Sequence, residues 1–410
     1  MTTQQPQDEA RLSAPVLVLI GICTLIYFLD GLIHSVLGPL APDIARSLSL
    51  GNTQLGPIFS ANLLGQCIGL VVFPLFAGRI GQRGIVLVSV VGFGLGQAGS
   101  ALATGATDLF VWRLVTGVFL GGVLPSCLAM VTAEAPAKRR GLSIMTLFMG
   151  YGAGATAAGL VVAMVGSWRA VMVTVGAACL FTALIAWLWL RIPGQRASGH
   201  AAEDRQASAF AILSPRYLTG TLMLWLLFIA MLTISYCLNS WLPTMLVKVG
   251  RDESLAAISV SIFSFGGIVA ALVIGLLIDR LGAMRTLISF VTIAAIVLFL
   301  LGRMLATASS GVLLALLGAC GFFVLGAYGG VNVVLASFYP DALRATRIGW
   351  AKSVGRIGTV IAPGLIGMGL AAGMAESAVM SAFAVPALLA VLSLVVIALV
   401  TRPRTAGNSG

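Results

Sequence analysis

Very few ionisable side chains lie inside the long apolar stretches of this 410-residue chain, and these few define its possible chemistry. Asp30 and His34 lie four residues apart in the first stretch, and Arg113 lies in the fourth. Lys352 and Arg356 lie four residues apart in the eleventh. A carboxylate and an imidazole can bind protons, and a guanidinium can form paired hydrogen bonds with a carboxylate. These residue types predict proton binding and recognition of an organic anion.

The depths of Asp30 and Arg113 predict a charge pair. If the apolar stretches are membrane-spanning helices, Asp30 lies about 22 Å from the inner end of its helix and Arg113 about 8 Å from the outer end of its own. In a bilayer core of about 30 Å, the two residues then lie at the same depth. Protonation would neutralise Asp30 and break this pair. We therefore assign Asp30 and Arg113 to proton coupling. His34 lies one helical turn beyond Asp30 on the same face. The alternatives are that Asp30 is a helix-end acid facing outer water and that His34 only caps the helix.

Arg356 is the strongest candidate for holding a carboxylate. It lies nine residues past Arg347, about 13 Å into its helix and near the middle of the membrane. The adjacent Gly355 and Gly358 permit close approach of a ligand or of a neighbouring helix. The alternative for Arg356 is pairing with backbone carbonyl groups between helices. Lys352, one turn nearer the cytoplasm, either adds a second cation to the site or extends to the membrane surface.

Uncharged side chains in three later stretches complete the candidate substrate site. Packing or interfacial anchoring explains the aromatic ones equally well, whereas a buried amide needs hydrogen-bond partners. Three cations against one acid inside the stretches favour an anionic substrate. Besides Arg113, Lys352 and Arg356, the candidate substrate-binding residues are Tyr236, Asn239, Tyr328, Asn332 and Trp350.

The composition of the chain predicts which structural elements hold these residues in position. With 59% hydrophobic and only 9% charged residues, the chain cannot be an ordinary soluble domain, where charged residues are about a quarter. A membrane-spanning helix needs about 20 apolar residues. We therefore predict an all-α membrane protein with twelve transmembrane helices in two six-helix bundles. The expected spans are 15–37, 54–77, 84–104, 108–132, 142–165, 168–190, 218–246, 254–277, 285–304, 310–334, 347–371 and 377–400.

The polar segments between these spans predict the domain organisation and the orientation. A cytoplasmic tail (1–14), an N-terminal bundle (15–190), a cytoplasmic linker (191–217), a C-terminal bundle (218–400) and a second tail (401–410) are expected. Sixteen of the 24 Lys and Arg residues then fall on one side and five on the other. The side rich in positive charge is cytoplasmic. We expect a multi-pass protein of the bacterial inner membrane with both termini in the cytoplasm.

The sequence disfavours enzymes and metal proteins. Its six cysteines lie in apolar runs without a CxxC pair, and its two histidines lie far apart, so neither a metal cluster nor a Ser/His/Asp constellation can be assembled. The net charge of +11 is explained by membrane orientation rather than by nucleic acid. We expect a monomer in the lipid bilayer, with no cofactor and with protons as the coupling ion.

A motif repeated about 200 residues apart relates the two halves. After the eighth span, Gly275, Asp279, Arg280, Gly282 and Arg285 form the pattern G-x-x-x-D-R-x-G-x-x-R, expected to act in gating. The copy after the second span reads Gly78, Arg79, Gly81 and Arg83, with glycine in place of the acid. Arg113, Gly117 and Gly121 form a second pattern, R-x-x-x-G-x-x-x-G. In these motifs the chain resembles the major facilitator superfamily.

Within that superfamily, three segments resemble the aromatic acid/proton symporters. They are 30–42 (DGLIHSVLGPLAP), 240–246 (SWLPTML) and 336–367, which contains RAT, GWA and VGRIG. The resemblance implies alternating access and proton-coupled import of an organic anion, expected to be an aromatic carboxylate. An anion exchanger or efflux carrier for a related acid is the alternative. Ile33 replaces the family's second acid, His34 a usual threonine and Lys352 a usual apolar residue.

Overall fold

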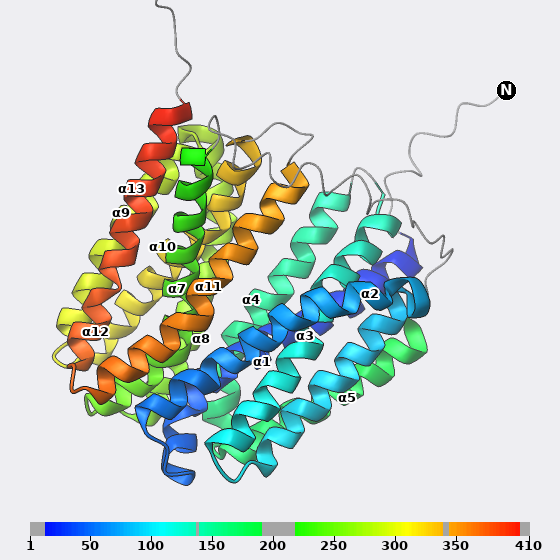
Figure 1. The fold of residues 1–410 in the computed structure, drawn as a ribbon, viewed down its shortest axis with the longest axis horizontal. Coiled ribbons are helices and arrows are strands. Elements are labelled where there is room, and N and C mark those ends of the chain that lie inside the picture. The colour runs from blue at the N-terminus through cyan, green and yellow to red at the C-terminus, as the bar shows by residue number, and fades with distance from the viewer. Residues whose placement is uncertain (1–12, 137–138, 191–217, 339–343, 402–410) are drawn as a thin grey trace, which may run out of the picture. The chain divides into compact units, whose positions relative to one another are not determined.

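The computed structural model describes residues 13–136, 139–190, 218–338 and 344–401, and within these ranges it describes the side chains except at 332–333, 335–338, 344–352 and 401. These parts of the chain are helical, with short connections and no strand (Figure 1). The chain divides into two compact units, residues 1–199 with 256–261 and residues 200–255 with 262–410.

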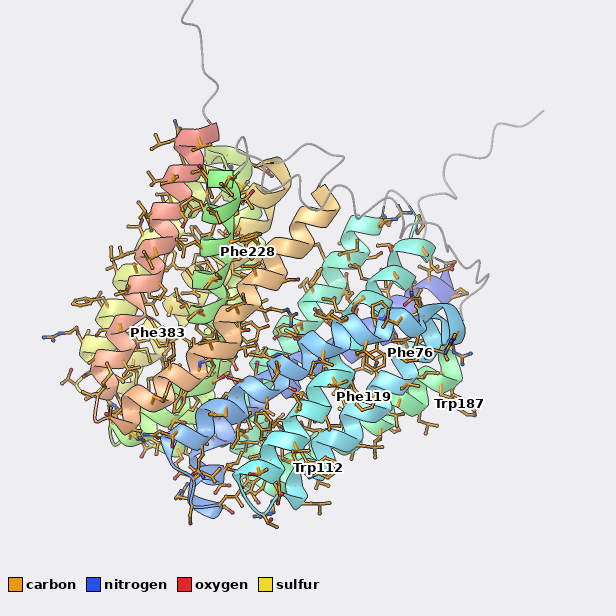
Figure 2. The ribbon with its side chains drawn as sticks, viewed as in Figure 1. Phe76, Trp112, Phe119, Trp187, Phe228 and Phe383 are labelled. Atoms are coloured by element: carbon orange, nitrogen blue, oxygen red, sulfur yellow. The ribbon has the colours of Figure 1, made fainter. Side chains whose placement is uncertain are left out.

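The first unit contains five long helices and one short turn of 3-10 helix. The very apolar stretches in this half are continuous helices because backbone groups in a membrane must be satisfied within the segment. Exposed side chains on their outer faces, such as Phe76 and Trp187, are apolar (Figure 2). The helices are α1 (Ala14–Ser47), α2 (Asn52–Gly99), α3 (Ala106–Glu134), α4 (Arg140–Val165) and α5 (Trp168–Trp189), with the 3-10 turn Ser100–Leu102 after α2.

The second unit continues the same pattern. Its last span is divided at Phe383, and the two pieces together run from Glu376 to Thr401. The helices are α7 (Leu218–Lys248), α8 (Glu253–Leu281), α9 (Ala283–Met304), α10 (Ser310–Phe338), α11 (Arg344–Ala371), α12 (Glu376–Ala382) and α13 (Ala384–Thr401).

The length of α2 reconciles the helix count with the prediction. The described residues contain eleven helices long and apolar enough to cross a membrane, but the 48 residues of α2 span about 72 Å, more than twice a bilayer core. Its helical geometry is interrupted at Gly81, where φ is 68° and ψ is 167°. α2 therefore supplies two spans, and the predicted twelve are confirmed.

The same backbone conformation recurs at the corresponding place in the second half. Gly282, between α8 and α9, has φ of 85° and ψ of 148°. A side chain is strongly disfavoured in this region, which glycine alone enters readily. The repeated motif is therefore also a repeated backbone turn, and this explains its glycine.

Helix α1 is longer than predicted. It was expected to end near residue 37, before Gly38 and Pro39, but it continues through Pro39 and Pro42 to Ser47. Proline is tolerated inside membrane helices because neighbouring groups satisfy the freed backbone carbonyls. Asp30 consequently lies in the middle of α1 rather than at its end, which removes the helix-end interpretation of this acid.

Glycines allow α2 and α3 to pack with their backbones in contact. A Cβ atom on Gly117 would collide with the carbonyl oxygen of Asn62, and one on Gly121 would lie 2.6 Å from that of Gln66. Gly65 and Gly69 of α2 face the carbonyl oxygens of Leu114 and Val118 in the same way. The R-x-x-x-G-x-x-x-G pattern is thus a helix-packing surface, as expected of small residues four apart.

We expect Gly117→Val to disrupt this interface. The added side chain has no space beside the backbone of α2, so the helices must separate, at a cost of about 3 kcal/mol. The measurement is the midpoint of thermal unfolding in detergent. Gly21→Val is the matched control, because a Cβ atom added to Gly21 on α1 would have no atom within 4 Å. Equal midpoints for the two variants would contradict this role.

Candidate functional site

Asp30 and His34 form a buried pair on α1. His34 Nδ1 lies 3.4 Å from Asp30 Oδ1, and the His34 and Asp30 side chains are only 5% and 2% exposed. Their spacing of four residues places them on one side of the helix, as the sequence predicted. A carboxylate and an imidazole in contact and away from water can hold and exchange a proton.

Helix α4 packs directly against this part of α1. Gly31 lies against the carbonyl oxygen of Tyr151, so the two backbones meet beside the acid. The ring of Tyr151 lies 6.1 Å from the His34 ring and 5.5 Å from the Tyr27 ring, measured between centroids. Tyr151 was not among the predicted site residues.

Arg113 is fully buried in α3 but does not meet Asp30. Its Nη2 donates to Gln97 Oε1 at 2.8 Å and to Ser100 Oγ, and its Nε donates to Ser100 Oγ at 3.2 Å. Its Nη1 is buried without a hydrogen-bond partner. The predicted Asp30–Arg113 pair is therefore wrong for this structure, in which His34 is the partner of Asp30.

The reason for this error is geometric. Depth in the membrane follows from residue counting, but the direction of a side chain depends on how its helix is rotated about its own axis. Arg113 points toward the end of α2, where Gln97 also donates to Met172 Sδ of α5. Polar residues in the third predicted span, Gln97 and Ser100, were the signal for these partners.

In the second unit, Arg356 lies half-buried on α11 between two glycines that contact α7. A Cβ atom on Gly355 would lie 3.0 Å from Phe228 Cβ, and one on Gly358 would lie 3.0 Å from the carbonyl oxygen of Ile229. These glycines therefore admit a neighbouring helix, one of the two possibilities open from the sequence. The contact fixes the position of the intervening Arg356.

Two predicted tyrosines lie near this arginine. Tyr328 of α10 is within electrostatic range of both Tyr236 of α7 and Arg356 of α11, and its ring contacts Phe228 edge to face at 6.4 Å. Asn239, half-buried on α7, lies three residues after Tyr236 and so on a similar side of the helix. Tyr328 is thus under the electrostatic influence of a guanidinium and of a second phenol, and the three groups belong to three helices. We refer to Tyr236, Tyr328 and Arg356 as the tyrosine–arginine cluster.

Three further candidates cannot be placed by side chain. Asn332 belongs to α10, and Trp350 and Lys352 belong to α11, but their side chains lie outside the described ones. Their assignment to the substrate site remains a prediction.

The predicted gating motif lies at the junction of α8 and α9. Asp279, Arg280 and Arg285 are exposed, and Thr286 Oγ1 donates to the carbonyl oxygen of Gly282 at 2.9 Å. A Cβ atom added to Gly275, at the first position of the motif, would have nothing within 4 Å. Their role in gating remains a prediction.

The first-half copy of the motif differs in its interactions. Gly78, which replaces the acid, also has open space where a Cβ atom would lie, so packing does not require glycine there. Arg83 Nη2 donates to the carbonyl oxygen of Trp187 at the end of α5, at 2.7 Å. In this copy of the motif, an arginine therefore connects α2 to α5 by a hydrogen bond, and the acid of the motif is replaced by glycine.

Comparison with known proteins agrees with this arrangement. The family model described as Major Facilitator Superfamily matches residues 23–363 and 224–410. The chain is 31% identical over 367 residues to the 3-(3-hydroxy-phenyl)propionate transporter of Escherichia coli, with 88% of each chain covered. It is 30% identical over 389 residues to the 4-hydroxybenzoate transporter PcaK of Acinetobacter baylyi, covering 86% of this chain and 84% of that one.

Solved structures show the same fold at lower identity. The crystal structure of the D-xylose-proton symporter aligns with a TM-score of 0.79 at 16% identity, covering 94% of this chain and 97% of that one. At this identity, the similarity concerns the fold alone.

Proposed function

From the premise that this chain belongs to the major facilitator superfamily and is a membrane transporter rather than an enzyme, we propose that it imports an aromatic carboxylate together with protons. Transport would proceed by alternating access, the mechanism of two-bundle transporters. The observation that carries the substrate class is the tyrosine–arginine cluster on α7, α10 and α11.

The chemistry of this cluster suits an aromatic acid. The guanidinium of Arg356 can bind a carboxylate with two parallel hydrogen bonds, and Lys352, one turn earlier on α11, adds a second cation in the same helix. Tyrosine rings offer both aromatic surface and hydroxyl groups that hydrogen-bond. The relatives named above are transporters of hydroxylated aromatic acids, which supports a substrate of this class.

The proton-coupled part of the proposal is supported by the Asp30–His34 pair. An acid in the middle of a membrane helix is rare without a function, and here it contacts a titratable imidazole at 3.4 Å. A substrate anion that moves with protons can be accumulated by the proton gradient. Exchange of one anion for another without proton movement needs no such group.

Orientation and assembly complete the proposal. The excess of Lys and Arg on one side of the spans supports cytoplasmic termini in the bacterial inner membrane, and we expect a monomer.

The test is uptake of labelled 4-hydroxybenzoate into proteoliposomes with an imposed pH gradient, acid outside. We expect accumulation above the external concentration, competition by gallate and 3-hydroxyphenylpropionate, and no competition by tetraphenylphosphonium. Accumulation that requires a second carboxylate preloaded inside, and that ignores the pH gradient, would identify an exchanger instead. Competition by the cation and not by aromatic acids would contradict the substrate class.

A further inference from the structure

We propose that the turn inside α2 binds the headgroup of an anionic phospholipid through Arg79 and Arg83. This site is separate from the proposed transport chemistry, and its test does not depend on the identity of the substrate. Three features carry the inference: two arginines without an acidic partner among the described residues, a hydrogen bond that holds one of them in place, and exposed aromatic rings beside them. We refer to Arg79, Arg83 and Trp187 as the α2 turn site.

The α2 turn site lies at a membrane surface. Because α2 supplies two spans, the interruption at Gly81 is the point at which the chain leaves the bilayer core and returns to it. Following the direction of the chain, α3 ends at Glu134 and α5 ends at Trp189 on this same side of the first unit. The side chains around the turn therefore lie at the level of the lipid headgroups, outside the apolar core of about 30 Å.

The turn carries positive charge that no described side chain neutralises. Arg79 is exposed and forms no hydrogen bond or ion pair within the described parts of the chain. Glu134, an acid at the same end of the unit, is not paired with Arg79 or Arg83. Gly78 stands where the second copy of the motif has its acid, Asp279. The first copy thus has a net charge of +2, whereas the second copy, with two arginines and one acid, has +1.

Arg83 is held in position by the end of α5. Its Nη2 donates to the carbonyl oxygen of Trp187 at 2.7 Å. Its Nε is buried without a partner, and its Nη1 forms no hydrogen bond to any described residue. Membrane orientation explains why positive charge occurs at this surface, but it does not require a guanidinium to be fixed there. A fixed guanidinium with unused donors matches the oxygens of a phosphate group.

Exposed aromatic and aliphatic side chains adjoin the two arginines. Trp187 and Trp189 at the end of α5 are 61% and 65% exposed, and Phe76 and Ile80 of α2 are 43% and 47% exposed; Phe76 and Trp187 are labelled in Figure 2. Tryptophan rings in membrane proteins gather at the level of the headgroups. A ligand that suits this surface has a phosphate for the arginines and acyl chains for the rings. An anionic phospholipid has both, whereas dissolved phosphate has only the first.

The test compares the binding of two phospholipids to the purified protein in detergent. Phosphatidylglycerol is titrated against phosphatidylcholine of the same short acyl chains, whose choline cancels the phosphate charge, and the rise in thermal unfolding midpoint gives each dissociation constant. Each arginine near an anionic headgroup contributes about fivefold, so we expect phosphatidylglycerol to bind about 30-fold more tightly. Equal affinities would overturn the proposal. Inorganic phosphate should not raise the midpoint; a rise as large as that with phosphatidylglycerol would identify a simple anion site instead.

Gly78→Asp locates the site, because it restores the acid of the motif where a Cβ atom would have nothing within 4 Å. The net charge of the turn falls to +1, so the preference for phosphatidylglycerol should fall to about fivefold. Gly105→Asp is the matched control: it adds the same charge in equally open space at the opposite end of the bundle, and should keep the full preference. A full preference in Gly78→Asp would show that the lipid binds elsewhere. If Gly78→Asp does not fold, Arg79→Gln makes the same charge change at an exposed side chain and provides the same test.

Discussion

Replacing Arg356 with alanine is expected to weaken the binding of 4-hydroxybenzoate by about 100-fold. A charge-assisted, paired hydrogen bond in a partly buried site contributes about 3 kcal/mol, and the tyrosine–arginine cluster contains no second cation among its described side chains. Arg356→Lys retains the charge but loses the planar fork, so we expect an intermediate loss of about tenfold. The measurement is the dissociation constant of the purified protein by calorimetry.

The control for this prediction is Arg303→Ala. Arg303 is exposed near the end of α9 and lies outside the cluster, so its loss should leave the dissociation constant unchanged. Thermal unfolding of all three variants would show that the fold is retained. Unchanged affinity in Arg356→Ala would remove Arg356 from the substrate site and restore its alternative role as a structural arginine.

Asp30→Asn is expected to abolish accumulation on a pH gradient at every external pH while preserving exchange of labelled for unlabelled substrate. The amide can neither bind nor release a proton, so the pH gradient can no longer load this position with a proton. We expect the internal substrate concentration to fall to the external one. The measurements are gradient-driven uptake and exchange in the same proteoliposomes.

Ser35→Ala is a suitable control for this variant. Ser35 is also buried on α1 but does not ionise, so the substitution tests whether any polar change in this helix stops coupling. We expect accumulation to be retained. An Asp30→Asn protein that still concentrates substrate on a pH gradient would show that the coupling proton binds elsewhere.

The fold of this protein could be predicted from local properties of the sequence. Each apolar stretch is long enough to cross a bilayer, and a membrane segment must satisfy its own backbone groups, so length and composition determine helices. The turn after the second span and that after α8 were visible as repeated glycines at positions 81 and 282. The extent of α1 was missed, because Pro39 and Pro42 end helices in water more reliably than in a membrane protein.

Most partners of the site residues could not be predicted from local properties of the sequence. Spacing alone placed Asp30 and His34 on one face, since residues four apart in a helix are always neighbours. Whether Arg113 meets Asp30 depended on the rotation of α3 about its axis, and close contact of Gly117 and Gly121 with α2 fixes that rotation. In the same way, contacts of Gly355 and Gly358 with α7 fix the position of Arg356, whose charge acts on Tyr328. Sequence determined which residues could do the chemistry and how deep they lie; backbone contacts between helices, which no single helix contains, decided which of them meet.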